Sequence, residues 1–197
     1  AGQLGRNRVD EKGNEYKDHN PGYDVTFSAP KSVSVAAFIG NDSRVIEAHD
    51  AAAKTAFGHI EKSVGTRIRE NGEVRFEQTG KLAAAGFRHE TNRNCEAQLH
   101  THYVAANITQ SADGKFRSID GIAFYHAQRE ATEVYQAELS RRLQEIGYEV
   151  ERVAGKNGVS YIAIKDIPQE LNEPHSSRRA ELTEALKKRG IDPDNAT

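Results

Sequence analysis

Residues 87–102 read FRHETNRNCEAQLHTH and contain three histidines, His89, His100 and His102. The chain on either side of the polar segment 92–98 is rich in strand-forming residues and predicts two strands, at 82–91 and 99–109. Alternate residues of a strand project from the same face, so His100 and His102 emerge side by side. If the two strands are antiparallel neighbours, His89 reaches the same place. The pattern therefore predicts three imidazoles that converge on one point.

Three neutral imidazoles can hold a divalent transition metal and leave coordination positions open for water or substrate oxygens. Because imidazole is a softer ligand than Mg²⁺ prefers, we expect Mn²⁺, Zn²⁺, Co²⁺ or Ni²⁺ to bind more tightly than Mg²⁺. A His-x-His pair alone is also compatible with an ordinary polar strand face, and the third histidine is what favours a metal site. His49 and His59 fall on a predicted helix and are expected at the surface or at the edge of the core.

The segments around this predicted hairpin alternate between helix and strand signals. Residues 23–27 follow a strand pattern, and the segment Ser28-Ala29-Pro30-Lys31-Ser32 predicts a turn into a helix, with Ser28 as its cap. This mixture indicates an α+β fold with helices packed on an antiparallel β-sheet, preceded by an irregular lead-in at 1–21. The other predicted elements are helices at 33–40, from 42 or 43 through 60, at 124–146 and at 177–189, and strands at 66–70, 73–79, 115–119, 148–153 and 160–164.

The composition narrows the class of protein further. The 197 residues are enough for one domain with a sizeable core, and 37% apolar and 28% charged residues are typical of a globular protein. No apolar run approaches the roughly 20 residues that span a bilayer, and the single cysteine, Cys95, favours a reducing cytoplasm. A net charge of −2 argues against non-specific DNA coating, so a nucleic-acid partner would need local contacts. Because no methionine is present, we expect the chain to be a piece of a longer protein.

Residues 87–102 resemble the histidine triad of the MobF-type conjugative relaxases, which belong to the HUH group of single-strand endonucleases. Two further segments resemble signatures of this family in the same order along the chain, GYDVTFSAPKSVS at 22–34 and QEIGY at 144–148. The resemblance implies a relaxase catalytic domain over residues 22–197, with an α+β fold of the HUH-endonuclease type. The chain departs from the family pattern at Ala97, where a proline usually stands, and it has Cys95 in the same loop.

The resemblance also implies a reaction and roles for individual residues. A tyrosine hydroxyl attacks one DNA phosphate, which leaves a 5′-phosphotyrosine and a free 3′-hydroxyl, and the strand can later be rejoined. His89, His100 and His102 would hold a divalent metal that stabilises charge on the phosphate. Asp24 would orient a ligand histidine or accept the tyrosine proton, and Arg93 would steady the phosphate. The implied function is site- and strand-specific DNA nicking and religation that initiates conjugative plasmid transfer.

The implied partners are single-stranded or hairpin DNA at a transfer origin and the conjugation machinery of a bacterial cytoplasm, with the relaxase as a monomer. Lys31, at the start of a predicted helix, is expected to contact a phosphate. Basic residues on predicted hairpins and turns also occur on ordinary solvated surfaces, and the resemblance favours DNA contact for Arg69, Arg75, Lys81, Lys115 and Arg117.

The nucleophilic tyrosines of this family lie near the start of the protein, upstream of anything in this chain. Tyr23 and Tyr103 neighbour Asp24 and His102, so strand alternation points both tyrosines to the opposite face. Tyr16 is the remaining candidate substitute. We therefore expect the N-terminal nucleophile segment to be missing, and the chain alone to form no covalent DNA adduct.

Two other functions are compatible with these residues. One is a relaxase-like module that binds single-stranded DNA or a hairpin without cutting it, which fits the missing tyrosine. The other is a different three-histidine metal enzyme, such as a hydrolase or an oxygenase, which leaves Arg93 and the turn at 28–32 unexplained. A DNA-cleavage assay set against an oxygenase assay separates the enzyme classes.

Overall fold

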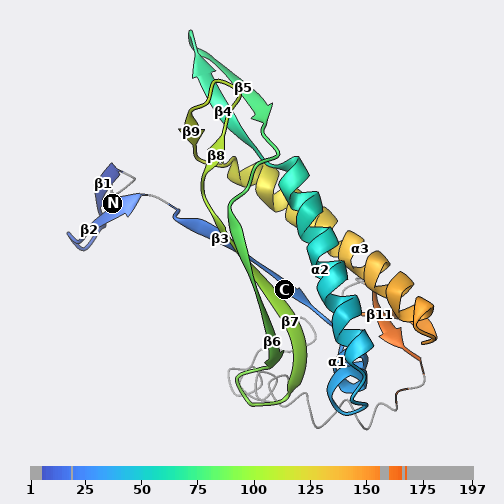
Figure 1. Ribbon diagram of the computed structural model, residues 1–197. Helices are drawn as coiled ribbons and strands as arrows, with labels where there is room; N and C mark the ends of the chain where they lie inside the picture. Colours follow the sequence, from blue (N-terminus) through green and yellow to red (C-terminus); the bar gives the residue numbers. More distant parts are fainter. Residues whose placement is uncertain (1–5, 19, 156–159, 166, 168–197) are drawn as a thin grey trace.

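The computed structural model describes residues 6–18, 20–155, 160–165 and 167, and it has the expected α+β fold (Figure 1). The predicted helix at 177–189 lies outside the described residues. No helix in the described part of the chain is both long and apolar enough to cross a membrane. The elements in chain order are β1 Arg6–Val9, β2 Glu15–Asp18, β3 Gly22–Ser28, α1 Lys31–Phe38, α2 Ser43–Ser63, β4 Gly65–Glu70, β5 Glu73–Gln78, β6 Ala84–Thr91, β7 Ala97–Ala106, β8 Thr109–Gln110, β9 Phe116–Arg117, α3 Gly121–Glu145, β10 Val150–Ala154 and β11 Ser160–Ile164.

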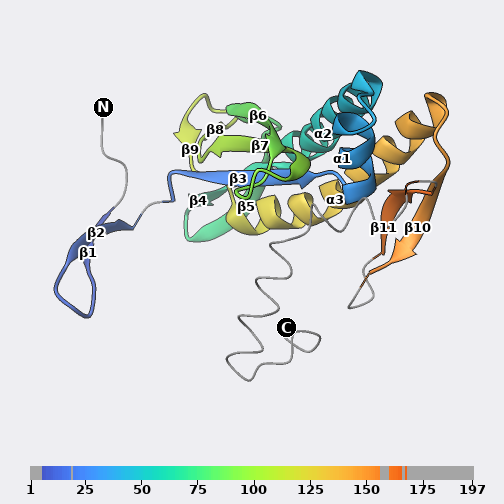
Figure 2. The ribbon, with the colours of Figure 1, turned by 90° about the horizontal axis from the view of Figure 1, so that it is seen from below.

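A three-stranded antiparallel sheet in the order β3-β7-β6 forms the centre of the molecule. Strand β3 and the first half of β7 alternate between inward and outward positions, so that Val25, Phe27, Leu99 and Thr101 all face inward, whereas β6 is exposed along its length. The long helices α2 and α3 lie side by side against this inner face (Figures 1 and 2). The inner face of the sheet therefore belongs to the core, and the opposite face of β3 and β7 stays open.

The core beneath the sheet is built from the apolar stripes of the two long helices and the inward residues of the strands. Asp42 begins α2 by accepting a hydrogen bond from the backbone N–H of Arg44, and Asp120 begins α3 in the same way through Ala123. Fully buried side chains that share this core include Val25, Val33, Val45, Ile60, Leu99, Phe124, Leu139 and Leu143.

The start of α1 differs from the sequence prediction. Ser28 is not the helix cap, because it pairs with His100 in the β3–β7 ladder and so extends the strand. Helix α1 begins after Pro30, which makes no side-chain capping bond. The turn between β3 and α1 is thus shorter than expected, and it holds the end of β3 against β7.

Part of the segment 1–21, which was expected to be irregular, forms two strands at Arg6–Val9 and Glu15–Asp18. β1 and β2 form an antiparallel hairpin that extends away from the rest of the molecule (Figure 1). The Asp10 carboxylate accepts hydrogen bonds from the backbone N–H groups of Lys12 and Asn14, and Gly13 adopts a φ of +82°. Polar turn chemistry of this kind specifies a hairpin without any apolar periodicity, which is why the pattern of the sequence missed it.

Candidate metal centre

The three histidines of residues 87–102 come together on the open face of the sheet. His89 of β6 is the register partner of His100 of β7, and His102 lies two residues further along the same strand. The ring centroids stand 5.2 Å apart for His89 and His100, 5.4 Å for His89 and His102, and 5.2 Å for His100 and His102. The predicted convergence of three imidazoles is therefore present in the structure.

These separations fit one ion held by three imidazoles. With metal–nitrogen bonds of about 2.0–2.1 Å and near-tetrahedral angles, the centroids of three ligating rings lie roughly 5 Å apart. Among the described residues, no three histidine, cysteine or carboxylate side chains are placed closely enough to coordinate an ion without some movement. The fit rests on the placement of the rings and on the nitrogens that they leave unused.

Two of the rings are fixed through Nδ1, which leaves Nε2 available. The Nδ1 of His100 lies 2.9 Å from the carbonyl oxygen of Gln98, and the Nδ1 of His102 lies 3.0 Å from both carboxylate oxygens of Asp24. Carbonyl and carboxylate oxygens can only accept, so in both rings Nδ1 carries the proton and donates it. This arrangement is the one found in proteins where Nε2 binds a metal and a second partner orients the ring.

Asp24 reaches His102 from the neighbouring strand β3, and its side chain is 56% exposed. Thr26, on the same face of β3, places its hydroxyl 3.0 Å from the same Nδ1. The sequence analysis did not identify Thr26, although its position two residues after Asp24 puts both side chains on one face. The geometry therefore places Asp24 and Thr26 together around the ring of His102.

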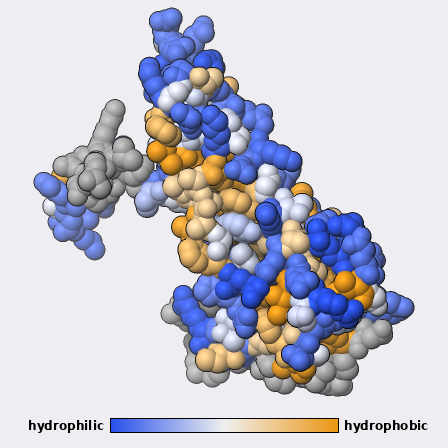
Figure 3. Space-filling view, in the orientation of Figure 1, coloured by the Kyte–Doolittle hydropathy of each residue, from blue (hydrophilic) through white to orange (hydrophobic). Residues whose placement is uncertain are grey.

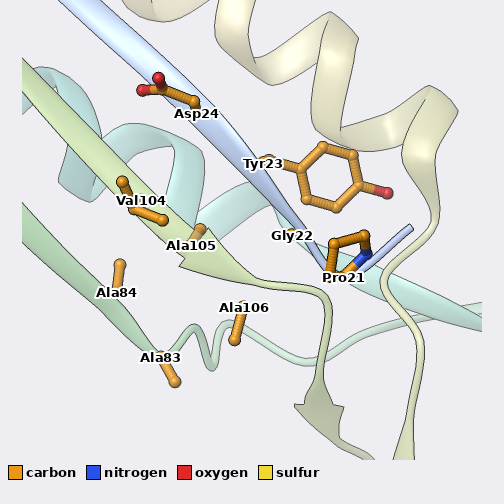
Figure 4. A pocket seen from close by; sticks show the side chains of 9 residues that line it. All are labelled: Pro21, Gly22, Tyr23, Asp24, Ala83, Ala84, Val104, Ala105 and Ala106. Carbon is orange, nitrogen blue, oxygen red and sulfur yellow. The ribbon is translucent and has the colours of Figure 1, made fainter. Parts of the chain in front are cut away.

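An open cavity of about 570 Å³ adjoins this group along the same face of the sheet (Figure 4). Figure 3 shows mainly apolar surface over this part of β6 and β7. Gly22 allows a close approach of the strands here, since a Cβ on it would lie 2.4 Å from the carbonyl oxygen of Ala105. The lining consists of Pro21, Gly22, Tyr23, Asp24, Ala83, Ala84, Val104, Ala105 and Ala106.

The tyrosines next to the site point away from it. Tyr23 is buried and stacks on Phe124 with ring centroids 4.1 Å apart, and Figure 4 shows its ring on the side of the strand opposite Asp24. Tyr103 stacks on Phe57 at 4.3 Å, within the helix layer. Burial raises the pKa of both hydroxyls. Strand alternation thus predicted both orientations correctly. The side chain of Tyr16, the remaining candidate, is not among those that the structure describes.

Arg93 lies in the turn that joins β6 to β7, and it is exposed. Asn92 organises this turn, since its side-chain oxygen accepts hydrogen bonds from the backbone N–H groups of Asn94 and Glu96. Cys95 adopts a φ of +59° in the same turn and is exposed. Within the part of the chain that the structure describes, no hydrogen bond or ion pair fixes the guanidinium of Arg93, so it is available to an anion.

Most of the basic residues expected to contact DNA have partners within the protein. Lys31 donates to the carbonyl oxygen of Ala97 at 3.2 Å, and burial lowers the pKa of its ammonium group. A contact of Lys31 with DNA therefore gains no support from the geometry and stays a prediction. Arg69 is exposed on β4. The other basic residues form ion pairs or a hydrogen bond: Arg75 with Glu77, Lys81 with Gln110, and both Lys115 and Arg117 with Asp113.

His49 is not at the surface or at the edge of the core, as its sequence position led us to expect. It is fully buried between α2, α3 and β7, with Tyr135 and Thr101 as its hydrogen-bond partners. His59 is partly exposed and pairs with Glu130 at 2.9 Å, as expected for a residue at the surface. His49 fell on the apolar stripe of its helix, but the two hydroxyls that satisfy it come from distant segments.

The fold and the histidine cluster together define a domain of the HUH single-strand endonuclease class. The family model described as TrwC relaxase matches residues 1–197, and the chain belongs to this family. The resemblance to the conjugative relaxases is thereby confirmed.

Individual relatives agree with this assignment. The multifunctional conjugation protein TraI of Escherichia coli is 41% identical over 176 residues, which cover 85% of this chain and 10% of that protein. TraI of Escherichia coli strain K12 is 42% identical over 151 residues, covering 72% and 8%. This chain thus spans about a tenth of the length of these relatives.

Solved structures of the conjugative relaxase TrwC have the same fold. One, a metal-bound complex with oriT DNA, is 34% identical with a TM-score of 0.84 and covers all of this chain and 65% of that one. Another, TrwC with a 27-mer DNA comprising the recognition hairpin and the cleavage site, has a TM-score of 0.83 and covers all of this chain and 68% of that one. The α+β assignment is confirmed by this similarity.

Proposed function

We propose that this domain nicks and rejoins one DNA strand at a transfer origin and so initiates conjugative transfer of a plasmid in the bacterial cytoplasm. The observation that carries the proposal is the cluster of three imidazoles on the open sheet face, two of them with Nδ1 engaged and Nε2 free. The names of the similar proteins, conjugation protein TraI and relaxase TrwC in complex with oriT DNA, support the same reaction.

We assign His89, His100 and His102 as ligands of one divalent metal ion. The TrwC complex of the same fold is metal-bound, which supports the presence of an ion in such a domain. Three imidazole nitrogens favour Mn²⁺, Zn²⁺, Co²⁺ or Ni²⁺ over Mg²⁺. Such an ion would withdraw charge from the non-bridging oxygens of the scissile phosphate. Asp24 holds His102 in the Nδ1-protonated tautomer, and Arg93 offers its guanidinium to a phosphate oxygen.

We propose that the attacking hydroxyl belongs to a tyrosine whose side chain the structure does not describe. Tyr23 and Tyr103 are packed in the helix layer, so neither can reach a phosphate bound at the histidines. We propose that a tyrosine of a preceding segment of the whole protein attacks the phosphate, and that residues 22–197 form the rest of the catalytic domain. The whole protein would act as a monomer on single-stranded or hairpin DNA, together with the conjugation machinery.

A relaxase-like module that binds DNA without cutting it is the second candidate function. It is favoured by one observation, that Tyr23 and Tyr103, the tyrosines next to the site in sequence, both pack away from the histidines. The two functions differ in whether a covalent bond to DNA forms.

The deciding experiment uses the natural protein that contains this chain and an oligonucleotide carrying the transfer origin. A denaturation-resistant protein–DNA adduct is expected, and His100→Ala should abolish it. His126→Ala is the control, since His126 is exposed on α3 and has no hydrogen-bond or ion-pair partner among the described residues. An adduct that forms equally well in His100→Ala would contradict the proposal, and DNA binding without any adduct would establish the non-cutting module.

A further inference from the structure

A chain of buried hydrogen bonds lies directly behind the three histidines. Thr101 stands between His100 and His102 on β7 and points to the opposite face, where its hydroxyl lies 2.9 Å from Nε2 of His49. Nδ1 of the same ring lies 2.7 Å from the hydroxyl of Tyr135. Exposure is 6% for Thr101, 0% for His49 and 3% for Tyr135. These two hydrogen bonds therefore join β7, α2 and α3 inside the core.

The buried ring of His49 needs both hydroxyls as hydrogen-bond partners. Burial lowers the pKa of His49 to about 4, so its ring is neutral near pH 7 and has one donor and one acceptor nitrogen. One hydroxyl must therefore donate to the ring while the other accepts from it. Removing either hydroxyl leaves a buried ring nitrogen without a partner, far from water.

The next residue of α2 contacts the other strand of the site. Asp50 lies 2.7 Å from a guanidinium nitrogen of Arg88, which is the register partner of Thr101 on β6. Arg88 immediately precedes His89, so α2 contacts both histidine-bearing strands at the level of the three rings. Both members of this ion pair are about 40% exposed, and such pairs are screened by solvent. The buried bond of His49 to Thr101 is accordingly the stronger of the two links.

We propose that His49 is a positioning residue for the metal site, acting through Thr101. This inference rests on the proposed metal-binding role of the histidines. His100 and His102 flank Thr101 in the sequence, so the distance between Thr101 and α2 sets the position of both ligand rings relative to α2. Metal ligands must be held within about 0.5 Å of their working positions by packing and by supporting hydrogen bonds. A hydrogen bond of fixed length between β7 and α2 supplies that constraint.

The test measures Co²⁺ binding by the protein, by titration and by the visible absorption of the bound ion. Thr101→Val keeps the shape of the side chain but removes the hydroxyl, and it should weaken Co²⁺ affinity by about tenfold and shift the absorption bands. Thr101→Ser restores the hydroxyl and should bind within about twofold of the unchanged protein. Tyr135→Phe, at the far end of the chain, should weaken binding in the same direction as Thr101→Val.

Thr66→Val is the matched control. Thr66 lies in β4, away from the site, is 2% exposed, and its hydroxyl donates to the carbonyl oxygen of Ser118. It should lose stability without a change in Co²⁺ affinity or spectrum. Unchanged binding in Thr101→Val, or an equal loss in Thr66→Val, would overturn the positioning role. If His100→Ala also binds Co²⁺ normally, the proposed metal site fails as well, which separates the two claims.

Discussion

His102 is held by side chains of the neighbouring strand β3, and its ring centroid lies 5.4 Å from that of His89 and 5.2 Å from that of His100. The carboxylate of Asp24 and the hydroxyl of Thr26 both lie 3.0 Å from Nδ1. A carboxylate partner increases the basicity of the ring and fixes its orientation. Loss of the negative charge should therefore weaken the site without disturbing the fold.

Asp24→Asn is expected to slow adduct formation in the natural protein by roughly tenfold to hundredfold, since second partners of ligating histidines have effects of this size. Binding of the uncut oligonucleotide should stay nearly unchanged, because Asp24 is assigned to orientation. Rates come from quenched adduct assays and affinities from fluorescence anisotropy. Glu130→Gln alters an exposed carboxylate–histidine pair with His59 and serves as the control. A parallel loss of affinity and rate in Asp24→Asn would contradict the assigned role.

The burial of His49 predicts a dependence of stability on pH. Its pKa is lowered to about 4 from 6.5 by burial, and the charged or titratable groups around it are Asp50, Arg88, His100 and Tyr135. Because the pKa is lower in the folded state, the unfolded chain takes up the proton first as the pH falls. The contribution of the neutral ring is complete above about pH 6.5 and is lost toward pH 4, with a magnitude of about 3 kcal/mol.

Urea unfolding at pH 7.5 and pH 4.5 should show this effect as a difference between the protein and His49→Gln that shrinks at the lower pH. The ring itself can be followed by NMR and should remain neutral at pH 5.5. A difference in the free energy of unfolding that is the same at both pH values would refute the assignment.

Among the elements, the β6–β7 hairpin holds all three histidines, and the sequence located it well. The predicted strands at 82–91 and 99–109 compare with β6 at Ala84–Thr91 and β7 at Ala97–Ala106. Alternation is a local property of the chain, so it correctly placed His100 and His102 on one face. The partners of these residues were not predictable in the same way. Thr26 and His49 meet the hairpin across long sequence separations, which periodicity does not encode.

The turn of this hairpin leads to a prediction for Arg93. Its exposed guanidinium lies beyond the end of β6, where Asn92 holds the turn in shape. Arg93→Ala should lower the rate of adduct formation on the order of a hundredfold, the size expected for one donor to a developing anion. The melting temperature should not change. Arg129→Ala, an exposed arginine on α3, is the comparison, and equal rates in the two variants would remove Arg93 from the mechanism.

At the scale of the whole molecule, 27 basic and 29 acidic residues leave a net charge of −2, and in the described part of the chain the long helices cover one face of the sheet. Binding of DNA must then come from a few contacts on the open face. We expect single-stranded or hairpin DNA to bind more tightly than plain duplex. With about three phosphate contacts, affinity for a single strand should fall roughly twentyfold between 50 and 200 mM salt. Anisotropy titrations test both points; equal affinity for random duplex, or a much steeper salt dependence, would contradict them.

The position of the ligands along the chain has a consequence for how the domain assembles. His89, His100 and His102 span a single hairpin, whereas Asp24 precedes His102 by 78 positions. Closing a loop of that length costs roughly 1.6 kcal/mol more in chain entropy than closing the segment between the histidines. Hairpins form within microseconds, but pairing of β3 with β7 is slower because two helices and another hairpin separate these strands in the sequence. We therefore expect nascent chains to gather the three imidazoles first and to acquire the orienting carboxylate last, so that capture of an ion can precede the selection of the ring tautomer.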